Sequence, residues 1–391
     1  MNGRLLARCA TSLADGRCQM RDGQRFWYIL LAVGAVSLLL GMWGGLLRMG
    51  WPWPAVTPVT VAAHGALMVC GFLGTVIGLE RAVALRMWWV YLAPLLGAVA
   101  TVALLAGAPT TVGALGMVAA AAMLVAALAL IVHRHPALYT VIMLVGGAAW
   151  LVGNVLWLAG FPIYRVVLFW LAFLVLTVAG ERLELTRFTR TSPLRRETFV
   201  GAIGVLLGGV ALSIWSFDGG VRVAGLGMLL LAVWLLRYDI ALRTIRRAGV
   251  TRFIAIALLS GYVWLGVGGL LEMGVGAASA GYLYDAALHA VFVGFIMSMI
   301  FGHALIIIPA LTRRAIPFRP ILYVPLALLD LSLVLRVAGD LAAQAALRMA
   351  GGLLNAASIV LFIGLVAYCA LVPAPARTER VRDSGARRDA V

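Results

Sequence analysis

The residues in this sequence that are best suited to chemistry are three histidines within long apolar stretches. His64 and His289 lie in separate stretches, and His303 follows fourteen residues after His289. An ionisable side chain inside an apolar membrane helix is costly, so each of these histidines is a candidate functional residue. Imidazole binds metals through one ring nitrogen and keeps the other for a supporting hydrogen bond. The histidines are therefore candidate ligands of a metal or a haem iron.

His64 and His289 are expected at the same depth, near the outer ends of the second and tenth apolar stretches. Each lies about five residues inside its stretch, or roughly 7–9 Å below the outer boundary at about 1.5 Å per residue. Two histidines at one depth on different helices can bind one metal or haem iron from opposite sides, which is the site that the sequence predicts. The alternative is that each histidine only hydrogen-bonds a neighbouring helix.

Glycines surround His64, and they fit both interpretations. Gly65, Gly71, Gly74 and Gly78 all lie within the second apolar stretch. Small residues can clear space for a cofactor, and they also let helices pack closely.

His303 and Met68 are secondary candidates for metal ligands. His303 lies roughly 21 Å along the same helix from His289, at about 1.5 Å per residue, and so cannot share one iron with it. A packing or interfacial role is favoured for His303, with a second metal site as the alternative. Met68 follows His64 by four residues, on the same helix face. Its thioether could bind copper(I) or iron, although methionine is also ordinary packing in a glycine-rich bundle.

Several charged residues also fall within the apolar stretches. Arg336 is expected at the outer end of the eleventh stretch, where it could meet an anionic haem propionate, and pairing with Asp340 is the alternative. Asp330 lies in the middle of that stretch, where a carboxyl must be protonated or paired. Glu80 and Glu181 each precede an arginine at the inner end of a stretch, a pattern typical of interhelical ion pairs.

The elements that carry these residues are predicted to be membrane helices. Of the 391 residues, 63% are hydrophobic and 12% charged, whereas a soluble domain has about 45–50% apolar and about 25% charged residues. A helix needs about 20 apolar residues to cross a bilayer core of about 30 Å. Twelve runs qualify, starting near Phe26, Val59, Trp88, Val112, Ala137, Val166, Phe199, Val223, Phe253, Tyr284, Ile321 and Met349. We expect an all-α polytopic transmembrane helix bundle over residues 26–372, between a leader (1–25) and a disordered tail (373–391).

The arginines predict how this bundle is oriented. The chain has a net charge of +16, and all 31 of its basic residues are arginines. With the N-terminus in the cytoplasm, 26 arginines fall in cytoplasmic segments and five fall outside, as the positive-inside rule requires. The chain is therefore predicted to be a multi-pass protein of a bacterial inner membrane, with both termini cytoplasmic. The lipid bilayer is its expected partner, and nucleic acid is excluded because the positive charge is divided among short loops.

Two motifs resemble known haem proteins. The segment Leu47–Pro54, followed by His64-Gly-Ala-Leu-Met68, resembles the first two helices of haem-copper oxidase catalytic subunits. The closer resemblance is to the NnrS family of haem- and copper-associated membrane proteins. That family also has twelve spans, a histidine leading the second helix with Gly-Phe downstream (here Gly71-Phe72), and a later Gly-His (here Gly302-His303).

The resemblance implies a haem-copper-oxidase-like arrangement. In the oxidases, histidines of helices two and ten hold a low-spin haem near the outer face, and His64 and His289 lie on those helices. This chain departs from the oxidases because spans six and seven contain no histidine. Ala287 and Val291 also replace the closely spaced second histidine of helix ten. A haem–copper centre that reduces oxygen is therefore not expected.

Three functions stay open at this point. The resemblance implies a haem protein, with copper as a further cofactor and a small gas or a redox protein as partner. Its expected role is nitric oxide or nitrosative-stress tolerance, or membrane redox chemistry. A second function is a proton-coupled secondary transporter that uses Asp330, Glu181 or His303, although the sequence shows no duplicated half with broken helices. A third is an assembly subunit of a respiratory complex without a cofactor.

Overall fold

The computed structural model describes residues 27–186, 192–312 and 316–372, and within these ranges the regular structure is helical, with no strand. The expected leader (1–25) and tail (373–391) lie outside the described residues. The prediction of an all-α helix bundle is confirmed.

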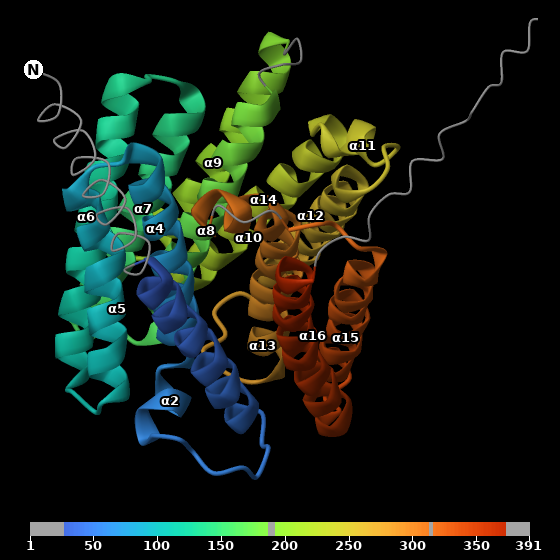
Figure 1. Ribbon diagram of the computed structural model, residues 1–391. Helices are drawn as coiled ribbons and strands as arrows, with labels where there is room; N and C mark the ends of the chain where they lie inside the picture. Colours follow the sequence, from blue (N-terminus) through green and yellow to red (C-terminus); the bar gives the residue numbers. More distant parts are fainter. Residues whose placement is uncertain (1–26, 187–191, 313–315, 373–391) are drawn as a thin grey trace, which may run out of the picture.

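The long helices follow one another along the chain and alternate in direction (Figure 1). The first half contains Trp27–Arg48, α2 (Pro58–Ala62), α3 (His64–Ala66), η1 (Leu67–Gly74), α4 (Thr75–Leu85), η2 (Trp88–Tyr91), α5 (Leu92–Leu105), α6 (Thr110–Arg134), α7 (Leu138–Leu158) and α8 (Ile163–Thr186). The second half contains α9 (Pro193–Leu212), α10 (Phe217–Tyr238), α11 (Ala241–Thr244), α12 (Val250–Val275), α13 (Tyr282–His289), η3 (Ala290–Met297), α14 (Ser298–Thr312), η4 (Pro320–Leu322), α15 (Tyr323–Leu341) and α16 (Ala345–Leu371).

In the described part of the chain, eleven helices are long and apolar enough to cross a membrane. The seventh expected span is present as the 20-residue helix α9, but Arg195, Arg196 and Glu197 near its start limit its apolar length. Leucines with high exposure, such as Leu331 at 70%, cover the outside of the bundle, as a lipid-facing surface requires. The protein is a multi-pass membrane protein.

The helix Trp27–Arg48 begins, and α16 ends, on the same side of the bundle, which is the upper side in Figure 1. The arginine-bearing helix α11 lies on that side too. We call it the inner side, after the predicted orientation, and we call the opposite side the outer side.

Close backbone contacts hold the helices together. Lipid tails are as apolar as leucine, so helix association in a bilayer depends on tight packing rather than on removing apolar surface from water. Gly225 of α10 and Gly269 of α12 show this at the point where their helices cross. A Cβ on Gly225 would lie 2.7 Å from the carbonyl oxygen of Gly269, and a Cβ on Gly269 would lie 2.6 Å from that of Gly225. Either substitution would push the two helices apart.

Two large groups of buried apolar side chains fill most of the described bundle, beside two small ones around Leu79 and Val90. The larger group joins η1 to the helices from α5 to α10, and the rings of Trp150 and Phe173 stack within it at 4.9 Å. The other joins the helix Trp27–Arg48 to α12–α16, where Phe301 and Phe362 stack at 3.8 Å. Phe72 packs against both groups. The histidine site lies where the two groups meet.

Two π-helical segments interrupt the spans that carry the site histidines. The segment η1 begins three residues after His64, and η3 begins directly after His289, and each is eight residues long. π-Helical turns are rare and frequently occur at functional sites. They change which side chains the following helix presents to its neighbours. In both spans this change of helix face occurs just after the histidine.

Candidate functional site

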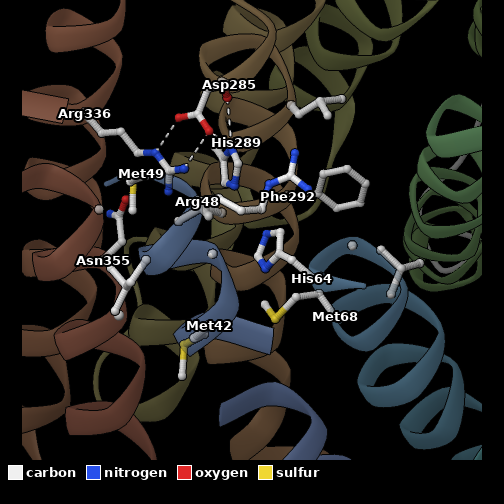
Figure 2. Close-up of a pocket in the computed structure, with 18 of the residues that line it drawn as sticks. Met42, Arg48, Met49, His64, Met68, Asp285, His289, Phe292, Arg336 and Asn355 are labelled. Atoms are coloured by element: carbon white, nitrogen blue, oxygen red, sulfur yellow. Dashed lines mark hydrogen bonds and ion pairs between the residues drawn. The ribbon is translucent and has the colours of Figure 1, made fainter. Parts of the chain in front are cut away.

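A cavity of about 380 Å³ in the outer half of the bundle contains both His64 and His289 (Figure 2). The helix Trp27–Arg48, the second and tenth spans, α15 and α16 all contribute to its wall. Its volume is within the range of roughly 300–1,000 Å³ that is typical of small-molecule sites.

The structure brings the two predicted histidines together. The ring centroids of His64 and His289 are 6.2 Å apart, and the ring planes differ by 20°. Two imidazoles that bind one metal at about 2.0–2.1 Å each have ring centres roughly 6 Å apart. The distance between the ring centres therefore agrees with that of two imidazoles bound to one metal ion.

Backbone carbonyls fix the orientation of both rings. The Nδ1 atom of His64 lies 2.6 Å from the carbonyl oxygen of Gly41, and Nδ1 of His289 lies 2.9 Å from that of Asp285. A carbonyl oxygen can only accept, so each Nδ1 carries the proton and donates it. In a neutral imidazole the other nitrogen, Nε2, then has a free lone pair. This hydrogen-bonded arrangement is the one that metal-binding histidines adopt.

The space for the His64 ring comes from a glycine on a different helix. A Cβ on Gly45 would lie 2.7 Å from Cε1 of His64, so no larger residue fits without moving the ring. Among the glycines near His64, Gly74 faces Trp150 and Gly78 faces Pro94, in contacts between helices. These two serve helix packing, which was the alternative that the sequence left open.

Arg336 lines the cavity but is held by a carboxylate. Its Nε and an NH₂ group donate to the two carboxylate oxygens of Asp285, each at 2.9 Å. Arg348 pairs with Asp340 at 3.0 Å and also lies 3.5 Å from Asp285. The partner of Arg336 is thus Asp285 rather than Asp340, the alternative to a propionate that the sequence offered. Because Asp285 also lies 3.3 Å from Nδ1 of His289, this ion pair stabilises the position of a site histidine.

Two further residues of the cavity were not identified from the sequence. Arg48, at the outer end of the first span, lines the cavity, and it has no ion pair among the described residues (Figure 2). The buried amide oxygen of Asn355 likewise has no hydrogen-bond partner there, although its NH₂ group donates to Ser332 at 2.6 Å. The apolar spacing that located the histidines gave no signal for these residues, because each becomes part of the site only through packing.

Met68 and His303 lie in different places. Met68 lines the histidine cavity, where its sulfur would lie 2.8 Å from a Cβ on Gly41 and so packs tightly against the first span. His303 lines a second cavity of about 430 Å³ in the inner half of the bundle. The prediction that His303 and His289 cannot share one iron agrees with this separation.

Two of the carboxylates within the spans, Glu181 and Asp330, accept hydrogen bonds from neighbouring helices. Arg81 of α4 donates a hydrogen bond to Glu181 of α8, which is an interhelical ion pair of the expected kind. Asp330 accepts hydrogen bonds from Ser260 at 2.6 Å and from Trp264 at 3.0 Å. Within the described ranges, no group of three or more His, Cys, Asp or Glu side chains is arranged to hold a metal ion. A metal at the His64–His289 pair would therefore need further ligands from a cofactor.

One family model matches residues 27–371, which include all the helices described above. Its description is "Domain of unknown function (DUF8744)". No curated protein matches the sequence.

Proposed function

The chain belongs to the DUF8744 family, and because the description of that family states no function, we propose one from the site itself. We propose that the protein binds haem in the outer cavity and takes part in membrane redox chemistry. His64 and His289 would hold the iron. The observation that carries this proposal is the 6.2 Å separation of two nearly parallel imidazoles whose Nδ1 atoms are both anchored.

The ligand set favours haem over a single metal ion. Zinc held by protein alone needs three or four ligands, and among their His, Cys, Asp and Glu side chains the described residues provide no such group. Haem would bring most of the iron's ligands with it, so His64 and His289 would be enough to hold it. Copper, which the resemblance to the NnrS family implies, stays a prediction.

The remaining cavity residues also suit haem. Phe72, Phe292 and Leu288 provide an apolar wall for a flat ring. Haem carries two propionate carboxylates, and a buried carboxylate needs a cationic partner. Arg48, which has no ion pair among the described residues, is the cation that we assign to a propionate, with Arg348 nearby. Arg336, the residue first expected in this role, would act through Asp285 and hold His289 in place.

The chemistry follows from the two ligands. Haem supplies one-electron redox chemistry when bound, and ligation by two neutral histidines suits electron transfer. The nitric oxide role implied by the resemblance stays a prediction, since a gas could bind iron only if one histidine left it. Addition of nitric oxide to the reduced protein checks this directly, because gas binding would change the absorption spectrum.

We also propose that the protein lies in a bacterial inner membrane with both termini in the cytoplasm. The support is the excess of arginines in the loops of one side. The outer cavity would then lie near the periplasmic face.

An optical spectrum of the purified, detergent-solubilised protein tests the haem proposal. The protein expressed with haem supplementation is expected to show a Soret band. Single replacements His64→Ala and His289→Ala should each abolish the native band, because each removes one axial ligand. His133→Ala is the matched control, since His133 is exposed at the end of α6, and it should leave the spectrum unchanged.

Two results would contradict the proposal. One is a colourless wild-type protein that is monodisperse and fully expressed in the presence of haem. The other is a Soret band that both histidine variants retain without change of position or intensity.

A further inference from the structure

The second cavity lies on the inner side of the first. Its walls are almost entirely aliphatic and aromatic side chains of the first, second, sixth, tenth and twelfth spans. The two cavities share a wall of four residues: Phe72 and Leu73 of η1, Met297 of η3 and Ile359 of α16. Both π-helical segments therefore end in the partition between the cavities.

This inner cavity reaches the lipid-facing surface. Ala35 of the first span and Ile363 and Ala367 of α16 line it, and all three are exposed. The two helices meet near their outer ends, where Met49 packs against Gly352, and they diverge toward the inner side (Figure 1). An apolar molecule in the bilayer thus has a lateral route into the cavity.

The few polar groups of the cavity are hydrogen-bond acceptors. The Nδ1 atom of His303 lies 2.8 Å from the carbonyl oxygen of Met299 and must donate to it, which leaves Nε2 as an acceptor. Glu80 contributes a carboxylate that is 3.6 Å from Arg81 and receives no hydrogen bond from a described residue. The helices that carry Glu80 and His303, α4 and α14, contact each other. Glu181 and Thr177 also line the cavity, but Glu181 accepts a hydrogen bond from Arg81, and the Thr177 hydroxyl donates to the carbonyl oxygen of Phe173. Glu80 and Nε2 of His303 are therefore the acceptors that the cavity offers to a ligand at its inner end.

We propose that the inner cavity binds the reduced head group of a lipid-soluble quinone. A hydroquinone has an apolar body, a flat ring and two hydroxyl donors, which match an apolar cavity with two acceptors. The oxidised quinone has only carbonyl acceptors and cannot satisfy Nε2 of His303 or the Glu80 carboxylate. Glu80 and His303 are half-buried, and a ligand that covers an acceptor without donating to it costs about 1–3 kcal/mol, so the site discriminates in favour of the reduced form.

The position of the site suggests its reaction, and this step rests on the proposed function. Oxidation of one hydroquinone breaks two O–H bonds and yields the quinone, two protons and two electrons. The protons leave toward the inner side by way of Glu80. Haem held by His64 and His289 would supply a one-electron acceptor on the other side of the partition, and two such haems would take up the two electrons. Binding itself does not require the haem.

Calorimetric titration of the protein in quinone-free nanodiscs tests the binding. The probes are decylubiquinol, decylubiquinone and the dimethyl ether of decylubiquinol, which keeps the ring and tail but has no donor. We expect saturable binding of decylubiquinol, and binding at least about tenfold weaker for the other two, corresponding to about 1.4 kcal/mol. Glu80→Gln and His303→Leu should each weaken decylubiquinol binding by a similar factor. Asp330→Asn and His133→Leu, which alter a carboxyl and a histidine outside both cavities, should not.

The outcomes separate this inference from the haem proposal. The variants His64→Ala and His289→Ala are expected to lack haem. Decylubiquinol should still bind to them with unchanged affinity. If the wild type is colourless but binds decylubiquinol selectively, the haem proposal fails and the hydroquinone site stands. Equal affinity for the three probes, or binding that neither Glu80→Gln nor His303→Leu weakens, overturns the hydroquinone site and indicates an apolar cavity that only lipid tails fill.

Discussion

Two buried polar regions of the bundle differ in how completely their groups are paired. Behind the second span, Asn154 of α7 connects four spans: its oxygen accepts from Trp170 at 3.0 Å and from Cys70 at 3.4 Å, and its NH₂ group donates to Met117. Trp150 donates to Cys70 at 3.3 Å. In the histidine cavity, by contrast, the buried amide oxygen of Asn355 lacks a partner among the described residues, and Arg48, which is exposed, has no ion pair there.

The comparison distinguishes polar groups that stabilise the fold from polar groups that are left for a ligand. In an apolar interior nearly every polar group has a partner, and the Asn154 network satisfies this within the protein. The cavity satisfies it only on the side that holds the rings, through Nδ1. Its other side presents nitrogen lone pairs and a guanidinium, which is the pattern expected where a ligand completes the structure. Changes in the Asn154 network should therefore alter stability, and changes in the cavity should alter cofactor content.

The largest expected effect in the cavity, apart from loss of a ligand, is that of Gly45→Ala. The added Cβ would lie 2.7 Å from Cε1 and 3.0 Å from Nδ1 of His64, so the ring must leave its position. We expect haem content to fall at least about tenfold, corresponding to about 1.4 kcal/mol, as measured by the ratio of Soret to protein absorbance. Gly208→Ala is the control, because a Cβ on Gly208 meets no atom within 4 Å. Full haem content in Gly45→Ala would show that His64 is not held at this contact.

In the fully paired region, Asn154→Leu should reduce stability without changing colour. The substitution leaves the indole N–H of Trp170 and the thiol of Cys70 without their acceptor, and an unpaired buried donor such as this indole costs about 1–3 kcal/mol. We expect a lower free energy of unfolding in a detergent titration, while the folded fraction keeps its Soret maximum. Val155→Leu, at an exposed position on the same helix, serves as the control. A shift of the Soret maximum in Asn154→Leu would mean that the two regions are not independent.

A smaller effect is expected for Arg48→Gln. The loss of one charged hydrogen bond to a propionate should raise the haem dissociation constant about tenfold, or about 1.4 kcal/mol, and leave the Soret maximum in place because both axial ligands remain. Titration of the haem-free protein with haem measures this. Arg165→Gln removes another arginine from the outer side, and it should have no effect. Unchanged affinity in Arg48→Gln would remove this residue from the haem site.

The smallest effect should come from Met68→Leu. This replacement nearly conserves volume, so it should cost less than about 1.5 kcal/mol of stability. Because we assign both axial positions to histidines, the spectrum should not change in either oxidation state. A shifted Soret or α band would instead identify Met68 as a ligand.

The sequence by itself determined the fold class and the depth of the candidate ligands. Composition and the length of the apolar runs are local properties, and the bilayer thickness converts them directly into helices. The arginine distribution then placed His64 and His289 at one depth, and the structure brings their rings to 6.2 Å. The depth of each histidine could be predicted from the sequence because it depends only on the position of the residue along one helix.

Only the tertiary structure decided which side chains meet at that depth. The contact of Gly45 with His64, the pairing of Arg336 with Asp285 rather than Asp340, and the open guanidinium of Arg48 all depend on how helices are rotated about their axes. That rotation is set by packing between spans far apart in the sequence and, in the second and tenth spans, by the π-helical segments after the histidines. In a chain where nearly every face of a helix is apolar, no sequence periodicity distinguishes the face that lines a cavity from the face that meets lipid.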